Sequence, residues 1–167
     1  MMTWKPTVGW RVIDSLFLVI LLGLIGSIFV PVYSSNGRNR FELSNAKQCA
    51  LGALIYTNDN DDRLPLSARW MDLELPYVTN KQIFNSPAVK DAGQYGFAFR
   101  RALSGHKLSL TKSPTVTAMI FDSIETQWNA NGNLLLLPNP GRYNGKDVVA
   151  FMDGHAKTVS PDHKSYK

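Results

Sequence analysis

The longest apolar segment of the chain lies near its beginning. Residues 16–32 read LFLVILLGLIGSIFVPV, a run without charge, and Val12 and Ile13 extend it on the other side of Asp14. A helix rises about 1.5 Å per residue, so roughly 20 apolar residues cross a bilayer core of about 30 Å. The pattern therefore predicts a single membrane-spanning helix.

Two other interpretations of this segment are open. One is a buried core helix, although a small domain rarely encloses a helix that is apolar on every side. The other is a cleaved secretory signal, for which Lys5 and Arg11 would supply the basic segment. No A-x-A-like site follows the apolar run, which argues against conventional cleavage there.

A second helical pattern begins near Phe41. Apolar side chains then recur at spacings of three and four residues, which is one face of an amphipathic helix; they are Leu43, Ala46, Ala50, Ala53 and Leu54. The polar run 58–62 and Pro65 predict its end. We expect interruptions between the two helical segments near Pro31 and near Gly37, because these residues weaken or break helices.

The rest of the chain predicts a small sheet. Residues 116–121 are rich in strand formers, and 134–137 is a second short apolar run. Residues 148–152 lead into a turn at Asp153-Gly154, and 156–159 form the return strand. Prolines and glycines punctuate residues 66–110, for which we expect short helices or loops. The predicted fold is α+β, a long N-terminal helix packed on a small antiparallel sheet.

Charge and cysteine content narrow the classes of function. The 167 residues carry a formal charge of +5, and residues 1–40 account for +3 through Lys5, Arg11, Arg38 and Arg40 against Asp14. The remainder is nearly balanced and has no basic stripe of the kind that nucleic-acid binding requires, so no such partner is expected. Cys49 is the only cysteine, which excludes an internal disulfide and a multi-cysteine metal site.

The residues around Asp14 resemble a known processing site. Gly9-Trp10-Arg11-Val12-Ile13-Asp14 is similar to the cleavage and methylation motif of type IV prepilins and type II secretion pseudopilins. In that family a basic leader ends in Gly, an aromatic residue follows, and an acid lies five residues after the Gly. The positions of Gly23, Pro31 and Tyr33 also fit the family's pattern. Trp in place of Phe, and Asp in place of Glu, are the departures.

This resemblance implies a subunit of a pseudopilus or a type IV pilus-like fibre. Prepilin peptidase would cleave between Gly9 and Trp10, and Asp14 would neutralise the new amine of a neighbouring subunit. Pro31 would bend the helix. Residues 1–9 would be the leader, 10–33 the transmembrane helix, 34–62 an amphipathic stem and 63–167 the α+β head. The implied location is the bacterial inner membrane, with one span, a cytoplasmic N-terminus and a periplasmic or extracellular head.

A second resemblance covers most of the chain. The stretch 45–65, NAKQCALGALIYTNDNDDRLP, is similar to the helix end of a large bacterial group of pilin-like proteins. The group's later segments follow in order: Trp70, 76–78 (PYV), 83–87 (IFNSP), 95–96 (YG) and 151–155 (FMDGH). Many members of this group have a cysteine just before the Pro that ends the segment corresponding to 83–87, and another before the helix motif. Here those places hold Asn85-Ser86 and residues near Glu42, so the implied disulfide is absent and Cys49 is expected in the core.

Two alternative functions use the chain's candidate chemistry. Asp59, Asp61 and Asp62 form an oxygen-rich cluster, and with Asp153 they are the candidates for binding calcium. A membrane-anchored head that binds calcium or carbohydrate without polymerising is therefore one alternative function. A hydrolase using Asp153 and His155 is another, although a turn whose Asp accepts local N–H bonds explains this pair without catalysis. No catalytic motif is present, and we expect neither an enzyme nor a required cofactor.

Overall fold

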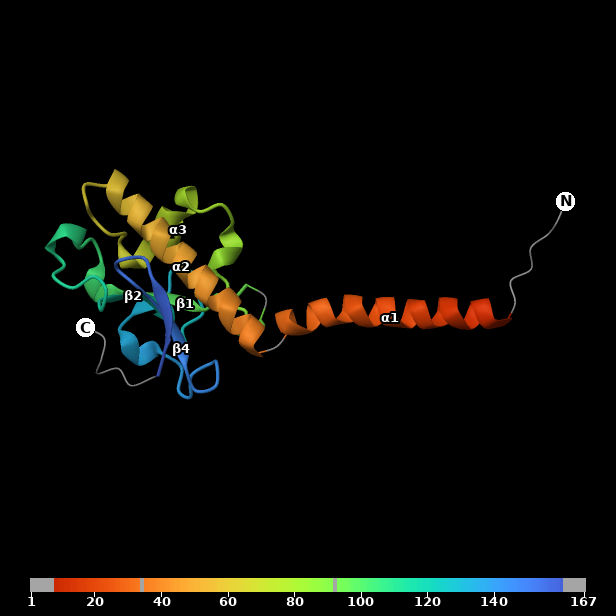
Figure 1. Ribbon diagram of the computed structural model, residues 1–167. Helices are drawn as coiled ribbons and strands as arrows, with labels where there is room; N and C mark the ends of the chain where they lie inside the picture. The colour runs from red at the N-terminus through yellow and green to blue at the C-terminus, as the bar shows by residue number, and fades with distance from the viewer. Residues whose placement is uncertain (1–7, 34, 92, 161–167) are drawn as a thin grey trace. The chain divides into compact units, whose positions relative to one another are not determined.

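The computed structural model describes the backbone of residues 8–33, 35–91 and 93–160, and the side chains of 12–27, 37–91 and 93–160 (Figure 1). The chain divides between Gly37 and Arg38 into two compact units. The first contains helix α1, Val8–Tyr33. Pro31 lies within α1, and its side chain is outside the described residues.

Helix α2, Ser35–Asp59, is continuous through Gly37, so the interruption expected there is wrong. Its inner face consists of small residues at the predicted spacing: Ala46, Cys49, Ala50 and Ala53 are all fully buried. After Asp59 the backbone turns through Asp61 and Asp62, which adopt φ of 54° and 61°. Aspartate is among the few residues that enter this left-handed region readily, which ends the helix as the sequence predicted.

The second unit is an α+β domain built on one five-stranded sheet. Its strands are β1 Phe97–Arg100, β2 Ala118–Asp122, β3 Asn131–Gly132, β4 Asp147–Phe151 and β5 Ala156–Val159. The order is β3-β1-β2-β4-β5. All neighbouring strands are antiparallel except β1 and β3, which are parallel. The expected antiparallel sheet is therefore mixed at one edge.

Both faces of the sheet are covered, so the central strands are buried along their whole length. In β4, Val148 and Ala150 join the cluster that contains the inner face of α2 and helix α3, Trp70–Glu74. Val149 and Phe151 point to the opposite face and pack against a second cluster. Figure 1 shows α2 lying across the face of the sheet to which Val148 and Ala150 belong.

The second face is covered by irregular chain rather than by a long helix. The apolar run at 134–137 is not a strand: Leu134–Leu136 forms a 3-10 turn, and Asn133 caps it by accepting a hydrogen bond from the Leu135 N–H at 3.0 Å. Leu134 and Leu137 are buried against the sheet. Strand β1 lies in the region 66–110, where only short helices or loops were predicted, so that prediction is wrong for residues 97–100.

Candidate functional site

A buried polar cluster joins α2 to the sheet and to the loops around it. Its centre is Glu42 of α2, whose side chain is fully buried. The carboxylate Oε2 accepts hydrogen bonds from Ser86 Oγ at 2.8 Å and from the Tyr143 hydroxyl at 2.6 Å. These donors stand 44 and 101 residues away in sequence, so a single carboxylate ties together three distant parts of the fold.

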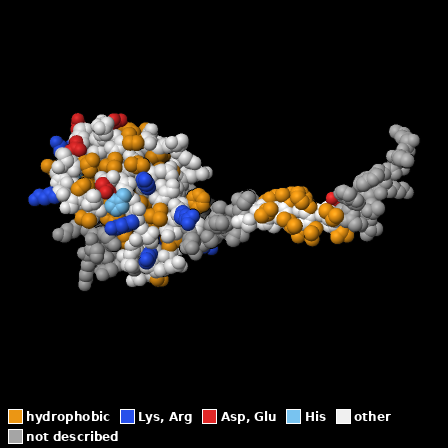
Figure 2. Space-filling view, in the orientation of Figure 1, with side chains coloured by type: hydrophobic (Ala, Val, Ile, Leu, Met, Phe, Trp, Pro, Cys, Tyr) orange, Lys and Arg blue, Asp and Glu red, His pale blue; other side chains and the backbone are white. Residues whose placement is uncertain are grey.

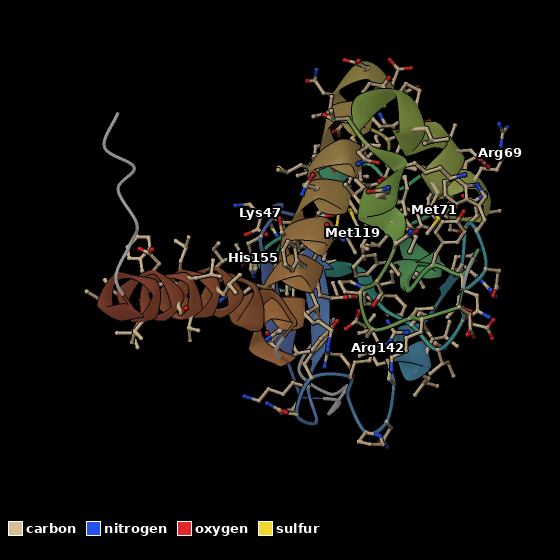
Figure 3. The ribbon with its side chains drawn as sticks, turned by 90° about the vertical axis from the view of Figure 1, so that its right-hand side faces the viewer. Lys47, Arg69, Met71, Met119, Arg142 and His155 are labelled. Carbon is tan, nitrogen blue, oxygen red and sulfur yellow. The ribbon has the colours of Figure 1, made fainter. Side chains whose placement is uncertain are left out.

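Arg142 supplies the positive charge of the cluster. It comes from the segment before β4 and is labelled in Figure 3. Its Nη1 lies 3.4 Å from Asp122 Oδ1 and 4.0 Å from Glu42 Oε1. The same guanidinium donates to the carbonyls of Gly96 and Ser123. A planar guanidinium with several fixed donors suits a site with many acceptors.

Two buried carboxyl groups therefore face one guanidinium. Burial raises the pKa of Asp122 well above its usual range, and the nearby charge and hydrogen bond of Glu42 raise it further. Arg142 and the N–H of Val148 act in the opposite direction without cancelling that rise. Like charges in one buried site oppose each other's ionisation, which is the physical reason that Glu42 acts in the same direction as burial on the pKa of Asp122. Burial, and then Glu42, also raises the pKa of Tyr143.

The cluster closes around a glycine that leaves no room for a side chain. A Cβ on Gly96 would lie 2.1 Å from Cβ of Ser86 and 3.0 Å from Nη1 of Arg142. This close approach brings the Gly96 carbonyl to 3.0 Å from the guanidinium. The Tyr95-Gly96 segment singled out in the sequence thus has a steric role.

The hydrogen bond between Ser86 and Glu42 lies where the second resemblance implied a disulfide in many relatives. The resemblance indicates these two places, but nothing in the sequence predicts a contact between their present occupants, Ser86 and Glu42. An acid between Phe41 and Leu43, next to the apolar face of the helix, was the available signal for Glu42. Nothing local to residue 142 indicates its role.

Cys49 and Glu74 lie on the same side of the domain core. Cys49 is fully buried as a free thiol, as predicted, with Sγ 3.6 Å from the carbonyl oxygen of Ile83. Burial raises its pKa, and the charges of Glu74 and Glu42 add to the effect. Neither carboxyl oxygen of the buried Glu74 has a hydrogen-bond partner in the described chain, and burial raises its pKa well above the usual range.

The turn at Asp153-Gly154-His155 has the geometry expected of a hairpin turn. Gly154 adopts φ of 87°, and Asp153 Oδ1 accepts the His155 N–H at 3.1 Å. The same oxygen lies 2.5 Å from His155 Nδ1, and the imidazole stacks on Phe151. Partial burial raises the pKa of Asp153, but the hydrogen bonds from His155 outweigh it and leave the pKa below its usual value.

The acidic run after α2 is a structured loop. Asp62 accepts hydrogen bonds from both the backbone N–H and the hydroxyl of Ser109. The hydroxyl bond and the backbone bond hold the pKa of Asp62 below its usual value. Among the residues that the structure describes, no group of three or more His, Cys, Asp or Glu side chains is placed to hold a metal ion, and this includes Asp59, Asp61 and Asp153.

The predicted processing and assembly residues belong to the first unit. The side chains of Gly9, Trp10 and Pro31 lie outside the described residues, whereas Asp14 is exposed on α1. Figure 2 shows hydrophobic side chains on the described part of α1. From Val12 to Ile25, its large apolar side chains are between 43% and 68% exposed. Within the described part of the chain, no helix combines the length and hydropathy needed to cross a membrane.

Comparison with known proteins identifies no relative. No family model, curated protein or solved structure matches the chain.

Proposed function

We propose that this protein is a structural subunit of a pilin-like fibre, either a type II secretion pseudopilus or a type IV pilus-like filament. Its N-terminal helix anchors it in the bacterial inner membrane and packs against neighbouring subunits, and its head faces the periplasm or the exterior. Prepilin peptidase cleaves it after Gly9. Catalysis is not part of this proposal.

The observation that carries the proposal is the composition and exposure of α1. The side chains from Val12 to Ser27 are all exposed, and Asp14 is the only charged residue among them. A helix that is apolar on every side is not stable when water surrounds it. It needs lipid or another protein to cover its side chains. Residues 10–33 as the membrane span remain a prediction from the sequence, because the side chains at both ends lie outside the described residues.

Asp14 supports assembly rather than anchoring alone. It lies five residues after Gly9 and is exposed on α1. A carboxylate in an apolar helix is costly unless a positive group neutralises it. The amine created at Trp10 of a neighbouring subunit would be such a group, since cleavage leaves it cationic near the membrane surface.

Small residues on α1 support close packing of helices. A Cβ added to Gly23 or Gly26 would meet no atom within 4 Å. Among the described residues, therefore, no neighbouring atom requires glycine at these positions. Glycines and serines let helix backbones approach closely in lipid, which is a reason for them that involves a second chain.

The test is incorporation of Asp14 variants into the sheared fibre fraction of the native host. Asp14→Ala should leave the head folded and the membrane level of the protein unchanged, but should abolish incorporation. Asp14→Glu places at this position the acid that is usual in prepilins, and it should retain fibre incorporation. Normal incorporation of Asp14→Ala would refute the fibre proposal and favour a membrane-anchored head that does not polymerise.

A further inference from the structure

A groove runs beside α2 and borders the buried cluster, because Ser86 also lines it. It lies between α2 and residues 80–87, which include the 3-10 helix Lys81–Phe84, and its volume is about 460 Å³. Figure 1 shows these two parts of the second unit. Five carboxamide side chains line the groove; they are Asn45, Gln48, Asn80, Gln82 and Asn85.

The chemistry of this lining is neutral and polar. No Lys, Arg, Asp or Glu is among the described residues that line the groove. Each carboxamide carries two N–H donors and an acceptor oxygen. Five such groups on one groove offer both kinds of partner at short intervals, which suits a ligand whose own groups also donate and accept.

Much of this hydrogen-bonding capacity is unused within the described chain. The Asn85 side chain makes no hydrogen bond to the residues that the structure describes, and its backbone carbonyl accepts one from Asn45 Nδ2 at 3.0 Å. Among the described residues, Gln48 donates only to Ser44 Oγ, at 3.2 Å. Asn80 Oδ1 caps the 3-10 helix by accepting from the Gln82 N–H at 2.8 Å. The capping bond holds one edge of the groove in place, while Asn85 and Gln48 remain available.

An exposed aromatic ring completes the groove. Phe41 is 51% exposed and lines the groove with Asn45 and Gln48, which follow it on α2 at helical spacing. A smaller hollow of about 140 Å³ shares Gln48 with the groove and extends along α2 past Leu51 and Tyr77. An apolar face next to several polar groups suits a ligand that has both C–H faces and hydroxyl edges.

We propose that this groove binds a short neutral oligosaccharide. Two vicinal hydroxyl groups of a sugar can donate to the oxygen and accept from the N–H of a carboxamide, and the C–H face of the sugar can pack on an aromatic ring. An extended peptide is less suited, because peptide recognition by strand addition needs free backbone groups at a sheet edge. Here the walls are α2 and the segment 80–87, neither of which is a strand, and carboxamide side chains supply the hydrogen-bonding groups. This binding activity goes beyond the structural role in a fibre and does not depend on it.

The experiment is saturation-transfer NMR on the full chain. The protein is kept in a zwitterionic detergent without a sugar headgroup, since glycosidic detergents would occupy the groove. The probes are cellopentaose, maltopentaose, laminaripentaose and chitopentaose, with a glycine–serine peptide of similar length as the competing class. We expect at least one pentasaccharide to bind with a Kd of about 1 mM or tighter. Added salt should leave its affinity nearly unchanged, because no charged group lines the groove.

The groove is identified by variants. Gln48→Ala combined with Asn85→Ala should weaken binding about tenfold, and Phe41→Ala should do the same. The control is Asn58→Ala, an exposed carboxamide on the same helix but outside the groove. No pentasaccharide binding, equal binding by the double variant, or binding of the peptide alone would each overturn the proposal. None of these outcomes bears on fibre incorporation, which is measured separately.

Discussion

Removing the Glu42 carboxylate tests whether the buried cluster holds α2 on the sheet. In Glu42→Ala, Ser86 and Tyr143 both lose their acceptor, and these bonds are short, at 2.8 and 2.6 Å. Hydrogen bonds to charged groups contribute about 1.5–3 kcal/mol each. Breaking a buried ionic group by removing one partner costs about 3–5 kcal/mol. We therefore expect Glu42→Ala to lower the free energy of unfolding by about 3–5 kcal/mol.

The assay is urea unfolding of the full chain in detergent, followed by tryptophan fluorescence, since Trp70 is buried in the same core. Glu125→Ala removes an exposed glutamate and should change the unfolding free energy by less than about 0.5 kcal/mol. Glu42→Gln keeps the side-chain volume and one acceptor oxygen. Its loss of unfolding free energy should therefore lie between the losses in Glu42→Ala and Glu125→Ala. A loss below about 1 kcal/mol in Glu42→Ala would refute the reasoning, because it would mean that water replaces both bonds.

Three further outcomes follow from the structure. Gly96→Ala should lower the free energy of unfolding by about 1–3 kcal/mol, because its Cβ would overlap Ser86. Urea unfolding measures this loss. The control is Gly26→Ala, whose Cβ would meet no atom within 4 Å and which should not destabilise the protein. Glu74 has a raised folded-state pKa, so stability should fall as pH rises above its ordinary pKa of 4.5, by up to about 1.4 kcal/mol per pH unit. Glu74→Gln should reduce that slope but not abolish it, because the pKa of Asp122 is also raised in the folded state. An unchanged slope would contradict the attribution of the pH dependence to Glu74. Gly26→Leu should leave unfolding of the head unchanged and reduce fibre incorporation, and equal incorporation would argue against helix packing there.

The sequence predicted those elements whose pattern is local. The inner face of α2 could be predicted because alanines at helical spacing mark it. Strands β2 and β4 could be predicted because burial on both faces makes them continuous apolar runs. The turn at Gly154 could be predicted because its residues favour positive φ.

The errors arose in short segments, where distant pairing or a single cap decides the structure. Strand β1 has four residues and becomes a strand by pairing with β2, whose Phe121 lies opposite Ala98, and with β3. The leucines at 134–137 have the composition of a buried strand, but the cap at Asn133 turns them into a 3-10 helix. A period-2 pattern cannot distinguish these outcomes in so short a segment.

The buried cluster shows the same limit for sites. Its members come from α2, from the end of β2 and from three loops, and no local spacing connects Glu42 with Tyr143, which is 101 residues away. The resemblance to pilin-like proteins did point to Ser86 and to the neighbourhood of Glu42, but as the location of a disulfide that this chain lacks. Side-chain packing was needed to show the polar contact that occurs there.

The mature N-terminus of the protein tests the central proposal most directly. The measurement is intact-mass and N-terminal peptide mass spectrometry of the chain isolated from membranes of its native host. The account predicts a chain that begins at Trp10, with a methylated amine. A chain that keeps Met1, or one cut beyond Ser34, would contradict it.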